Sequence, residues 1–318
     1  MSNKREVADA YMTVRYAVDR LAEDMSDDNP LKKYLHIPDL AHSKRRKSVK
    51  HATMLFSYNA GANTLGQRYF DALDGVKING KYIFREASVS EKNAVGKLIY
   101  RSLEKEFPQV TKTRELIGNI AEAHQISGKN SIEWVNPVGF PFKQEYRIKG
   151  TKVVELPDGS GGVMKLTVSD TTDEVDWSKQ YLGLAPNIIH SMDSAHKTLV
   201  TNRLKEKYGV RDFSNIHDSF ATHAGNNTLM YEVTKEVFQE FYKDRNWLEE
   251  LYNHFKKQGV PMLRYKRDAN GRKIKKTIKK LFGGTEEVFE TEPIPLSEIR
   301  DLGDYDFEDF DKLQYFFH

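Results

Sequence analysis

The 318-residue sequence contains no cysteine. This absence excludes disulfide bonds, thiolate metal sites and cysteine nucleophiles. The sequence also lacks any apolar run close to the roughly 18 residues that a membrane-spanning helix needs. Its N-terminus, Met1 to Glu6, is charged and leads into no apolar segment, so it contains no recognisable secretory signal. We therefore expect a soluble intracellular protein that does not associate with a membrane.

Charge of either sign is unevenly distributed, although 49 basic residues nearly balance 46 acidic ones. One basic group lies at 44–50, and a second at about 256–280 precedes an acidic C-terminal tail. Clustered basic residues favour nucleic-acid backbones through counterion release. A solvated surface is an equally good interpretation of a single basic run. The 39% of hydrophobic residues is sufficient for a folded core.

The hydrophobic periodicity predicts a fold that combines helices with antiparallel hairpins. Helices are expected at about 5–25, 43–58, 64–74, 90–106, 111–127, 189–207 and 226–254. Strands are expected at 132–135, at 143–147, on both sides of the glycine-rich turn at 157–162, and around residue 218. A further turn is expected at 268–271. This pattern is typical of an α+β protein.

A row of side chains in the helix predicted at 43–58 has the residue types expected of a nucleotide-binding surface. Arg46, Lys50, Met54 and Tyr58 recur every four residues and therefore lie on one stripe. The stripe is about 18 Å long at a rise of ~1.5 Å per residue, comparable with an extended nucleoside triphosphate. The two cations could bind phosphates, and the tyrosine could meet the sugar and base. An amphipathic helix with a basic end is the alternative.

An acidic turn lies between two hydrophobic segments at residues 213–222. A strand–turn–strand would expose the carboxylate of Asp218 at its tip. Mg²⁺ prefers oxygen ligands and is usually held by one or two carboxylates together with substrate phosphates. Asp218 is therefore the candidate metal ligand.

Several ordered segments resemble the C-terminal part of the phage and mitochondrial single-subunit RNA polymerases. The stripe from Arg46 to Tyr58 resembles the fingers helix that binds the incoming nucleotide, and Trp134 to Tyr146 resembles the segment before the specificity loop. Ala185 to His196 resembles the Pro-Asn-x-x-His-Ser-x-Asp-x-x-His segment of the family. His217 to Phe220 resembles the palm turn, and the C-terminal segments at 302–306 and 315–317 match as well.

The resemblance implies a right-hand polymerase fold that is incomplete without a partner chain. Residues 1–188 would form helical fingers, with a hairpin at about 148–175 in the place of the promoter-reading specificity loop. Residues 189–318 would form the C-terminal, antiparallel part of the palm, with a basic insertion at about 256–280 and the acidic tail.

The resemblance also implies roles for single residues. The implied nucleotide-binding residues are Arg46, Lys50, Met54, Tyr58 and Tyr11, and the implied catalytic set is Asp218, Lys50, Tyr58 and His190. Asp218 would be one of two aspartates that hold two Mg²⁺ ions. Tyr58 would help to select ribose, Tyr11 would frame the same pocket, and His190 would lie near the nucleotide or the RNA 3′ end. Asp193 and His196 are expected only to stabilise the start of their helix.

The second metal-binding aspartate is absent from the sequence. The family carries it upstream of the fingers helix in an Asp-x-x-x-Gly-x-Gln setting, which no upstream aspartate here has. The chain is therefore either a fragment or one subunit of a divided, heterodimeric phage polymerase, and its termini favour the subunit. We expect a second polypeptide carrying the N-terminal region, the thumb and the remaining palm. The other expected partners are the DNA template, ribonucleoside triphosphates and the RNA product, in the cytoplasm of an infected bacterial host.

The function predicted from this resemblance is that of a catalytic subunit of a DNA-directed RNA polymerase. The alternatives are a fragment of a family A-like DNA polymerase and a non-catalytic nucleic-acid-binding subunit. The segment His217-Asp218-Ser219-Phe220 favours RNA synthesis, because the DNA enzymes usually have His-Asp-Glu. The sequence departs from the family at Asn59 and Ala221, where glycines are usual, and in the insertion at 264–280.

Overall fold

The computed structural model describes residues 9–38, 40–157, 159–216, 219–243, 245–279 and 284–297. The described residues form two compact units that divide after Glu115. Residues up to Glu115 form unit 1, and those from Leu116 onward form unit 2. The predicted division into fingers and palm at residue 188 stays a prediction, and that residue lies inside a helix.

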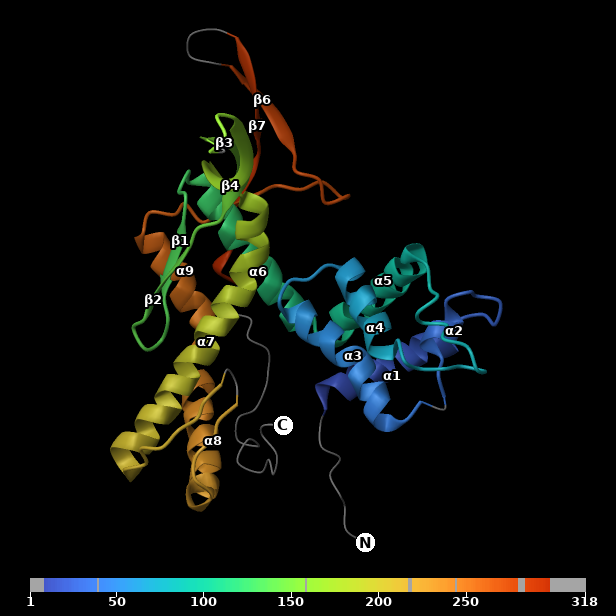
Figure 1. Ribbon diagram of the computed structural model, residues 1–318. Helices are drawn as coiled ribbons and strands as arrows, with labels where there is room; N and C mark the ends of the chain where they lie inside the picture. The colour runs from blue at the N-terminus through green and yellow to red at the C-terminus, as the bar shows by residue number, and fades with distance from the viewer. Residues whose placement is uncertain are drawn as a thin grey trace. The chain divides into compact units, whose positions relative to one another are not determined.

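Unit 1 is helical, as the periodicity predicts (Figure 1). Its helices are α1 (Ala10–Glu23), α2 (Lys32–Leu35), α3 (His42–Ser57), α4 (Ala62–Leu73), α5 (Val89–Glu106) and the first residues of α6 (Pro108–Ile126). Helix α3 buries Val49, Ala52 and Phe56 in the core of this unit. These positions lie on the opposite side of the helix from the stripe that begins at Arg46. The core contact therefore fixes which face of α3 is left for a ligand.

A buried arginine ties four segments of unit 1 together. The side chain of Arg15 is fully buried and donates hydrogen bonds to the Leu35 carbonyl at 2.6 Å and to the Tyr69 hydroxyl at 3.0 Å. Asp19, one turn further along α1, pairs with both Arg15 and Arg45. A buried charge without such partners would be strongly destabilising. The network therefore fixes α3, which carries Arg45, against α1.

Helices α4 and α5 approach each other at two glycines. A Cβ atom built on Gly66 would lie 2.1 Å from the carbonyl oxygen of Lys92. One built on Gly96 would lie 2.2 Å from the carbonyl oxygen of Ala62. Both atoms are backbone atoms of the facing helix, so no side-chain rotation can relieve these overlaps. The contact between the two helices therefore depends on the absence of side chains at these positions.

A capping box begins helix α5. The hydroxyl of Ser88 accepts a hydrogen bond from the N–H of Glu91 at 3.2 Å, and the Glu91 carboxylate accepts one from the N–H of Ser88 at 2.8 Å. The hydroxyl of Tyr34 donates to the same carboxylate at 2.9 Å. Hydrogen bonds from Ser88, and then from Tyr34, lower the pKa of Glu91 to about 2.

This pKa predicts an acid-sensitive contribution to the stability of unit 1. Because the pKa of Glu91 is lower in the folded state, its contribution is complete above about pH 4.5 and is lost as the pH falls toward about 2. The Glu91→Gln variant should be less stable at neutral pH by about 1 kcal/mol. As the pH falls from about 4.5 to about 2, this variant should also lose less stability than the unchanged chain. Urea unfolding followed by far-UV circular dichroism measures both, and equal acid sensitivity of the two proteins would contradict the assignment.

Unit 2 combines helices with antiparallel hairpins. Its helices are the rest of α6, α7 (Trp177–Tyr208), the 3₁₀ turn η1 (Ala224–Asn226), α8 (Asn227–Lys243) and α9 (Trp247–Lys257). Its strands are β1 (Ile132–Val135), β2 (Pro141–Gln144), β3 (Arg147–Pro157), β4 (Val163–Val175), β5 (Leu263–Tyr265), β6 (Lys275–Lys279), β7 (Thr285–Phe289) and β8 (Thr291–Pro293). Within the described residues they pair as β1–β2, β3–β4, β5–β8 and β6–β7. This mixture of helices and antiparallel strands agrees with the expected α+β class.

Helix α7 starts twelve residues earlier than the predicted helix at 189–207. Asp176 caps it by accepting a hydrogen bond from the N–H of Lys179 at 3.0 Å. Pro186 lies inside the helix, where proline normally breaks the hydrogen-bond pattern. The neighbouring Leu184 and Ala185 are buried in the core with α6. We infer that this tertiary packing outweighs the local preference of proline.

The expectation that Asp193 and His196 stabilise a helix start is therefore wrong. Both lie in the interior of α7. His196 is buried, its ring centroid is 5.6 Å from that of Phe238, and its Nε2 is 3.4 Å from the carbonyl oxygen of Thr234. His196 thus packs α7 against α8.

The predicted helix at 226–254 is two helices, because Asn246 caps α9 by accepting a hydrogen bond from the N–H of Glu249.

The basic insertion is partly neutralised by the acidic segment that follows it. Arg264 pairs with Glu292 at 2.8 Å across the β5–β8 ladder, and Lys275 pairs with Glu287 at 3.1 Å across the β6–β7 ladder. Lys266 pairs with Glu290 at 3.4 Å. Within the described residues, part of the basic insertion therefore lies beside acidic residues at 287–292. A nucleic-acid surface made of the whole insertion is not supported.

Candidate functional site

The stripe on α3 meets helix α1 at a cluster of two cations and an aromatic ring. The Nε atom of Arg46 donates to the Oδ2 atom of Asp9 at 2.6 Å, and its guanidinium lies 4.7 Å from the ring centroid of Tyr11. The Nζ atom of Lys50 lies 5.8 Å from the same centroid. Arg46 and Lys50 are only half-buried. The structure thus brings together Arg46, Lys50 and Tyr11, which the sequence predicts as nucleotide-binding residues.

Asp9 also belongs to this cluster. It caps α1 by accepting a hydrogen bond from the N–H of Tyr11 at 2.9 Å. Burial alone would raise the pKa of Asp9, but hydrogen bonds from Arg46 and Tyr11 and the charge of Arg46 outweigh it and keep the pKa below its usual value. Its position before an amphipathic helix indicates a cap. No sequence signal connects it with Arg46, 37 residues away.

The other two members of the stripe lie at the C-terminal end of α3. Met54 is 37% exposed. Tyr58 is half-buried and is the C-cap residue that follows Ser57, the last residue of α3. Asn59, the next residue, has a φ of 64°. This left-handed conformation is easiest for glycine and is tolerated by asparagine. The family glycine at this position therefore corresponds to a real backbone requirement.

Asn59 meets this requirement and adds a contact. Its Oδ1 atom accepts a hydrogen bond from Nη2 of Arg114 at 3.0 Å. Arg114 is nearly buried, and its guanidinium lies 4.3 Å from the ring centroid of Phe56 on α3. Asn59 and Arg114 together fix the chain that follows Tyr58. The departure from glycine is thus compatible with the turn.

In unit 2, the two segments around Trp134 and Asn187 that resemble polymerase motifs are bonded to each other. The indole N–H of Trp134 donates to Oγ of Ser191 at 3.0 Å. The amide of Asn187 donates to Oε1 of Gln144 at 2.7 Å and to the Tyr146 hydroxyl at 3.2 Å. His190 is exposed on α7 between these two attachments. The β1–β2 hairpin therefore fixes the part of α7 that carries His190.

Asp218 and His217 lie outside the described residues, as do the segments at 302–306 and 315–317. Ile216 and Ser219, which flank His217 and Asp218 in the sequence, form an antiparallel bridge with two hydrogen bonds of 2.9 Å. The expected strand pair is therefore present as one bridge. The amide of Asn215 donates to Oγ1 of Thr201 on α7 at 3.0 Å. Within the described ranges, no three histidine or acidic side chains are grouped to hold a metal ion.

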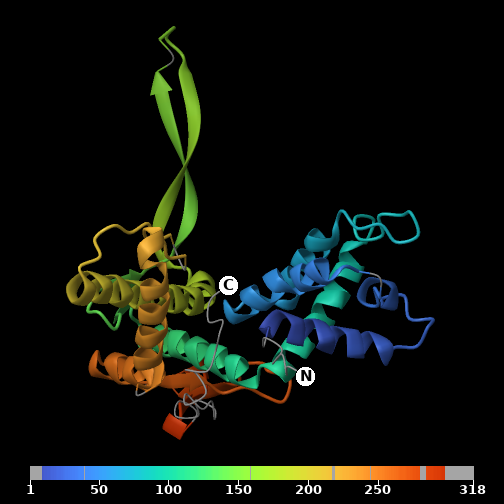
Figure 2. The same cartoon turned by 90° about the horizontal axis from the view of Figure 1, so that it is seen from below.

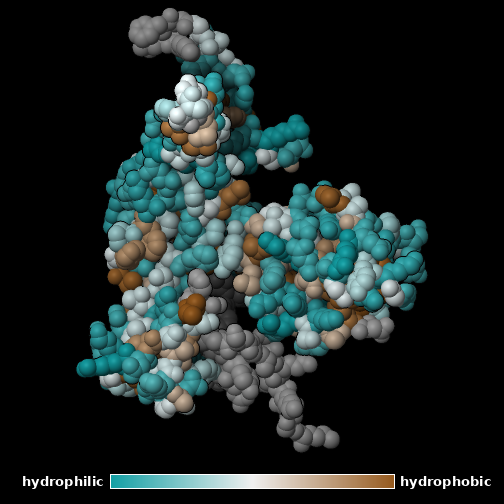
Figure 3. All heavy atoms as spheres, viewed as in Figure 1, coloured by the Kyte–Doolittle hydropathy of each residue, from teal (hydrophilic) through white to brown (hydrophobic). Residues whose placement is uncertain are grey.

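The expected hairpin at 148–175 is formed by β3 and β4, which Figure 2 shows as an arm standing out from the helices of unit 2. One face of its outer half carries the exposed side chains of Leu156, Met164 and Leu166. On the other face, Lys165 pairs with Glu155 at 3.0 Å. Figure 3 shows a largely hydrophilic surface with hydrophobic residues where β3 and β4 lie. The described outer half therefore presents apolar side chains on one face and an ion pair on the other.

Comparison with known proteins assigns the chain to a family. The profile described as DNA-dependent RNA polymerase matches residues 1–318. The chain is 27% identical over 280 residues to DNA-directed RNA polymerase 1, mitochondrial, of Arabidopsis thaliana, covering 84% of the chain and 27% of that protein. It is 25% identical over 232 residues to T7 RNA polymerase of Escherichia phage T7 and to the DNA-directed RNA polymerase of Enterobacteria phage K11. In each case the match covers 69% of the chain and 26% of the relative.

The chain belongs to the DNA-dependent RNA polymerase family of the phage and mitochondrial type. It spans about a quarter of the length of these relatives. None of the helices in the described part of the chain has the length and apolar character needed to cross a membrane.

Proposed function

We propose that this chain supplies the nucleotide-binding helix and one metal-binding aspartate of a DNA-directed RNA polymerase, and that a second polypeptide completes the active site. The observation that carries the proposal is the cluster of Arg46 and Lys50 on α3 with Tyr11 on α1. Membership of the polymerase family supports the reaction class. The match to only a quarter of each relative supports the need for the rest of the enzyme.

The cluster can bind a triphosphate without breaking the hydrogen bond between Arg46 and Asp9. Arg46 is already oriented by Asp9 and can present its remaining N–H groups to phosphate oxygens. Lys50 adds a second positive charge four residues further along the stripe. Since both side chains are half-buried, their charges are less screened than in open solvent. Tyr58 would meet the ribose at the far end of the stripe.

The reaction is template-directed nucleotidyl transfer. Asp218 would be one of the Mg²⁺ ligands, and an aspartate of the second polypeptide would be another. When bound, two Mg²⁺ ions activate the attacking hydroxyl and stabilise the leaving oxygen. The residues of this chain bind and orient the nucleotide, with Arg46 and Lys50 at the phosphates and His190 near the RNA 3′ end. Positioning and electrostatic stabilisation account for most of the catalysis.

Two other functions remain alternatives with distinct signatures. A DNA polymerase of the same superfamily would prefer deoxynucleotides and require a primer, and family membership argues against it. A non-catalytic nucleic-acid-binding subunit would not need the Arg46–Asp9 pair or the lysine beside it. The joint presence of Arg46, Lys50, Tyr58, His190 and Asp218 in one sequence favours the catalytic interpretation.

Reconstitution tests the proposal. The chain is mixed with the polypeptide of the same genome that carries the upstream polymerase regions, with a DNA template, ribonucleotides and Mg²⁺, and labelled RNA is measured. We expect RNA only when both polypeptides are present, and primer-independent incorporation of ribonucleotides. Full RNA synthesis by the isolated chain would refute the need for a second polypeptide. No synthesis by the mixture, although the two chains form a complex, would favour the non-catalytic alternative.

A further inference from the structure

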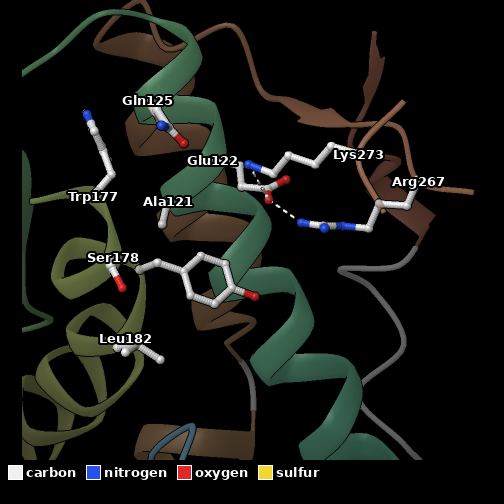
Figure 4. Close-up of a pocket in the computed structure, with 9 residues that line it drawn as sticks. Ala121, Glu122, Gln125, Trp177, Ser178, Leu182, Arg267 and Lys273 are labelled. Atoms are coloured by element: carbon white, nitrogen blue, oxygen red, sulfur yellow. Dashed lines mark hydrogen bonds and ion pairs between the residues drawn. The ribbon is translucent and has the colours of Figure 1, made fainter. Parts of the chain in front are cut away.

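A pocket in unit 2 has no role in the proposed reaction. Its volume is about 490 Å³, within the usual range for small-molecule sites. Its walls come from α6, from the first turns of α7 and from the basic insertion (Figure 4). The residues that line it include Glu122, Gln125, Trp177, Tyr181, Arg267 and Lys273.

A buried carboxylate holds two cations at one wall of this pocket. Glu122 is only 4% exposed and accepts a hydrogen bond from the N–H of Tyr265 at 3.2 Å. Arg267 donates to Oε1 of Glu122, and Nζ of Lys273 lies 3.6 Å from the same oxygen. Figure 4 shows both cations converging on this carboxylate. Among the described residues that line this wall, two positive charges face one negative charge, which leaves an excess of one positive charge.

The positions of both cations are fixed by further contacts. Nη1 of Arg267 donates to the carbonyl oxygen of Gly271 at 3.2 Å, and Nζ of Lys273 lies 3.8 Å from the ring centroid of Tyr265. The side chains are still 42% and 31% exposed. A guanidinium has five N–H donors, more than these contacts use. The wall is therefore preorganised for an anion rather than closed by its own ion pairs.

Two of the four residues that α7 contributes to the pocket, Trp177 and Tyr181, are aromatic. Trp177 and Tyr181 lie on successive turns of α7 and are both half-buried. A Cβ atom built on Gly118 would lie 2.6 Å from the Tyr181 hydroxyl oxygen, so this glycine of α6 makes room for the tyrosine. Asp176, the acidic residue that caps the start of α7, forms an ion pair with Lys179 at 2.7 Å. Gln125 also lines the pocket, and its amide can donate and accept hydrogen bonds.

We propose that this pocket binds one nucleoside monophosphate unit, with the base against Trp177 and Tyr181 and the phosphate at Arg267 and Lys273. A pocket lined by two aromatic side chains and a fixed pair of cations matches a ligand with a flat ring at one end and an anion at the other. Base stacking on aromatic side chains and an arginine–phosphate contact are both strong interactions. The unit can be a free nucleotide or one nucleotide of a single strand. The site is independent of the cluster on α3.

Binding to the full-length chain, measured by isothermal titration calorimetry, tests the proposal. The probes are AMP and UMP, adenosine without phosphate, inorganic phosphate, and a short single-stranded oligonucleotide. We expect the mononucleotides to bind at least about tenfold more tightly than adenosine or phosphate alone, because only they contact both walls. Equal affinity for mononucleotide and oligonucleotide identifies a free nucleotide as the ligand, and tighter binding of the oligonucleotide identifies a strand.

Variants localise the binding. Lys273→Gln and Trp177→Ala should each weaken mononucleotide binding about tenfold. The first removes the positive charge of Lys273 that contacts the phosphate, and the second removes a stacking surface for the base. Lys275→Gln is the matched control, because Lys275 lies two residues away, pairs with Glu287 and does not line the pocket. It should bind as the unchanged chain does. Circular dichroism establishes that each variant is folded.

Three results would overturn the proposal: no binding of mononucleotides, equal binding of inorganic phosphate and mononucleotide, or binding that Lys273→Gln and Trp177→Ala leave unchanged. In the last case, a loss of binding on Lys50→Ala would assign the nucleotide to the cluster on α3. Retained binding in Lys50→Ala together with loss in Lys273→Gln supports the pocket. The two nucleotide sites are thus tested separately, and failure of RNA synthesis in the reconstituted enzyme leaves this result unaffected.

Discussion

The Asp218→Ala variant is expected to reduce RNA synthesis by the reconstituted enzyme by about 10³-fold or more while leaving the chain folded. The reason is the distribution of metal ligands. The sequence has one carboxylate, Asp218, in the segment that resembles the palm turn of the family, and none in the upstream setting that resembles the site of the second one. If one of two metal-binding carboxylates is removed, the charge that develops at the transferred phosphoryl group loses its main stabilisation. RNA yield from a fixed template, at saturating Mg²⁺ and ribonucleotides, measures the effect.

Asp212→Ala is the matched control for this variant. Asp212 lies six residues earlier, is exposed, and forms an ion pair with His223 at 3.5 Å. The same change of charge and volume at Asp212 should leave RNA synthesis within about twofold of that of the unchanged enzyme, because surface ion pairs contribute little to stability. If Asp218→Ala also left synthesis unimpaired, the chain would act as a nucleic-acid-binding subunit and the metal assignment would be wrong. If both variants lost activity, the segment would matter for assembly rather than for chemistry.

The sequence predicts the local elements of this fold well because their signals are local. Periodicity predicts α3 and α5 to within about a residue of their observed ends, and the capping box at Ser88 marks the start of α5. The four-residue spacing places Arg46 and Lys50 on one side of α3 for the same reason. Asn59 is recognised as a departure from glycine, and the positive φ explains why glycine is usual there.

Contacts between distant segments are what the sequence does not predict. Asp9 orients Arg46 across 37 residues, and Glu122 holds Arg267 across 145 residues. Neither acidic residue has a local pattern that identifies its partner. The early start of α7 is missed for a related reason, since Pro186 is a local break signal that burial of its neighbours overrides. Tertiary packing decides these cases, and it appears only in the folded chain.

The Gly96→Ala variant is expected to destabilise unit 1 by about 3 kcal/mol or more, against the local preference of the helix. Helix propensity alone predicts the reverse, a gain of about 1 kcal/mol, because alanine is the better helix former. The geometry decides between the two. The added Cβ would lie 2.2 Å from the carbonyl oxygen of Ala62 and 2.8 Å from the backbone nitrogen of Gly66. These are backbone atoms, so α4 and α5 would have to separate and the surrounding core would lose contacts.

Two spectroscopic signals make this prediction specific to unit 1. The three tryptophans of the chain, Trp134, Trp177 and Trp247, all belong to unit 2, whereas both units contribute helical circular dichroism. Gly96→Ala should lower the thermal midpoint of a part of the circular dichroism signal by more than about 10 °C. The tryptophan fluorescence transition should move much less.

Gly75→Ala is the control for this substitution, because a Cβ atom there meets nothing within 4 Å. Its expected effect is below about 1 kcal/mol. An unchanged midpoint in Gly96→Ala would mean that α4 and α5 are not in contact at their glycines. A parallel shift of the fluorescence transition would mean that the two units unfold together. The expected separation of the two signals follows from the absence of tryptophan in unit 1 and from a core there, built on Leu65, Val95 and Ile99, that is distinct from the cores of unit 2.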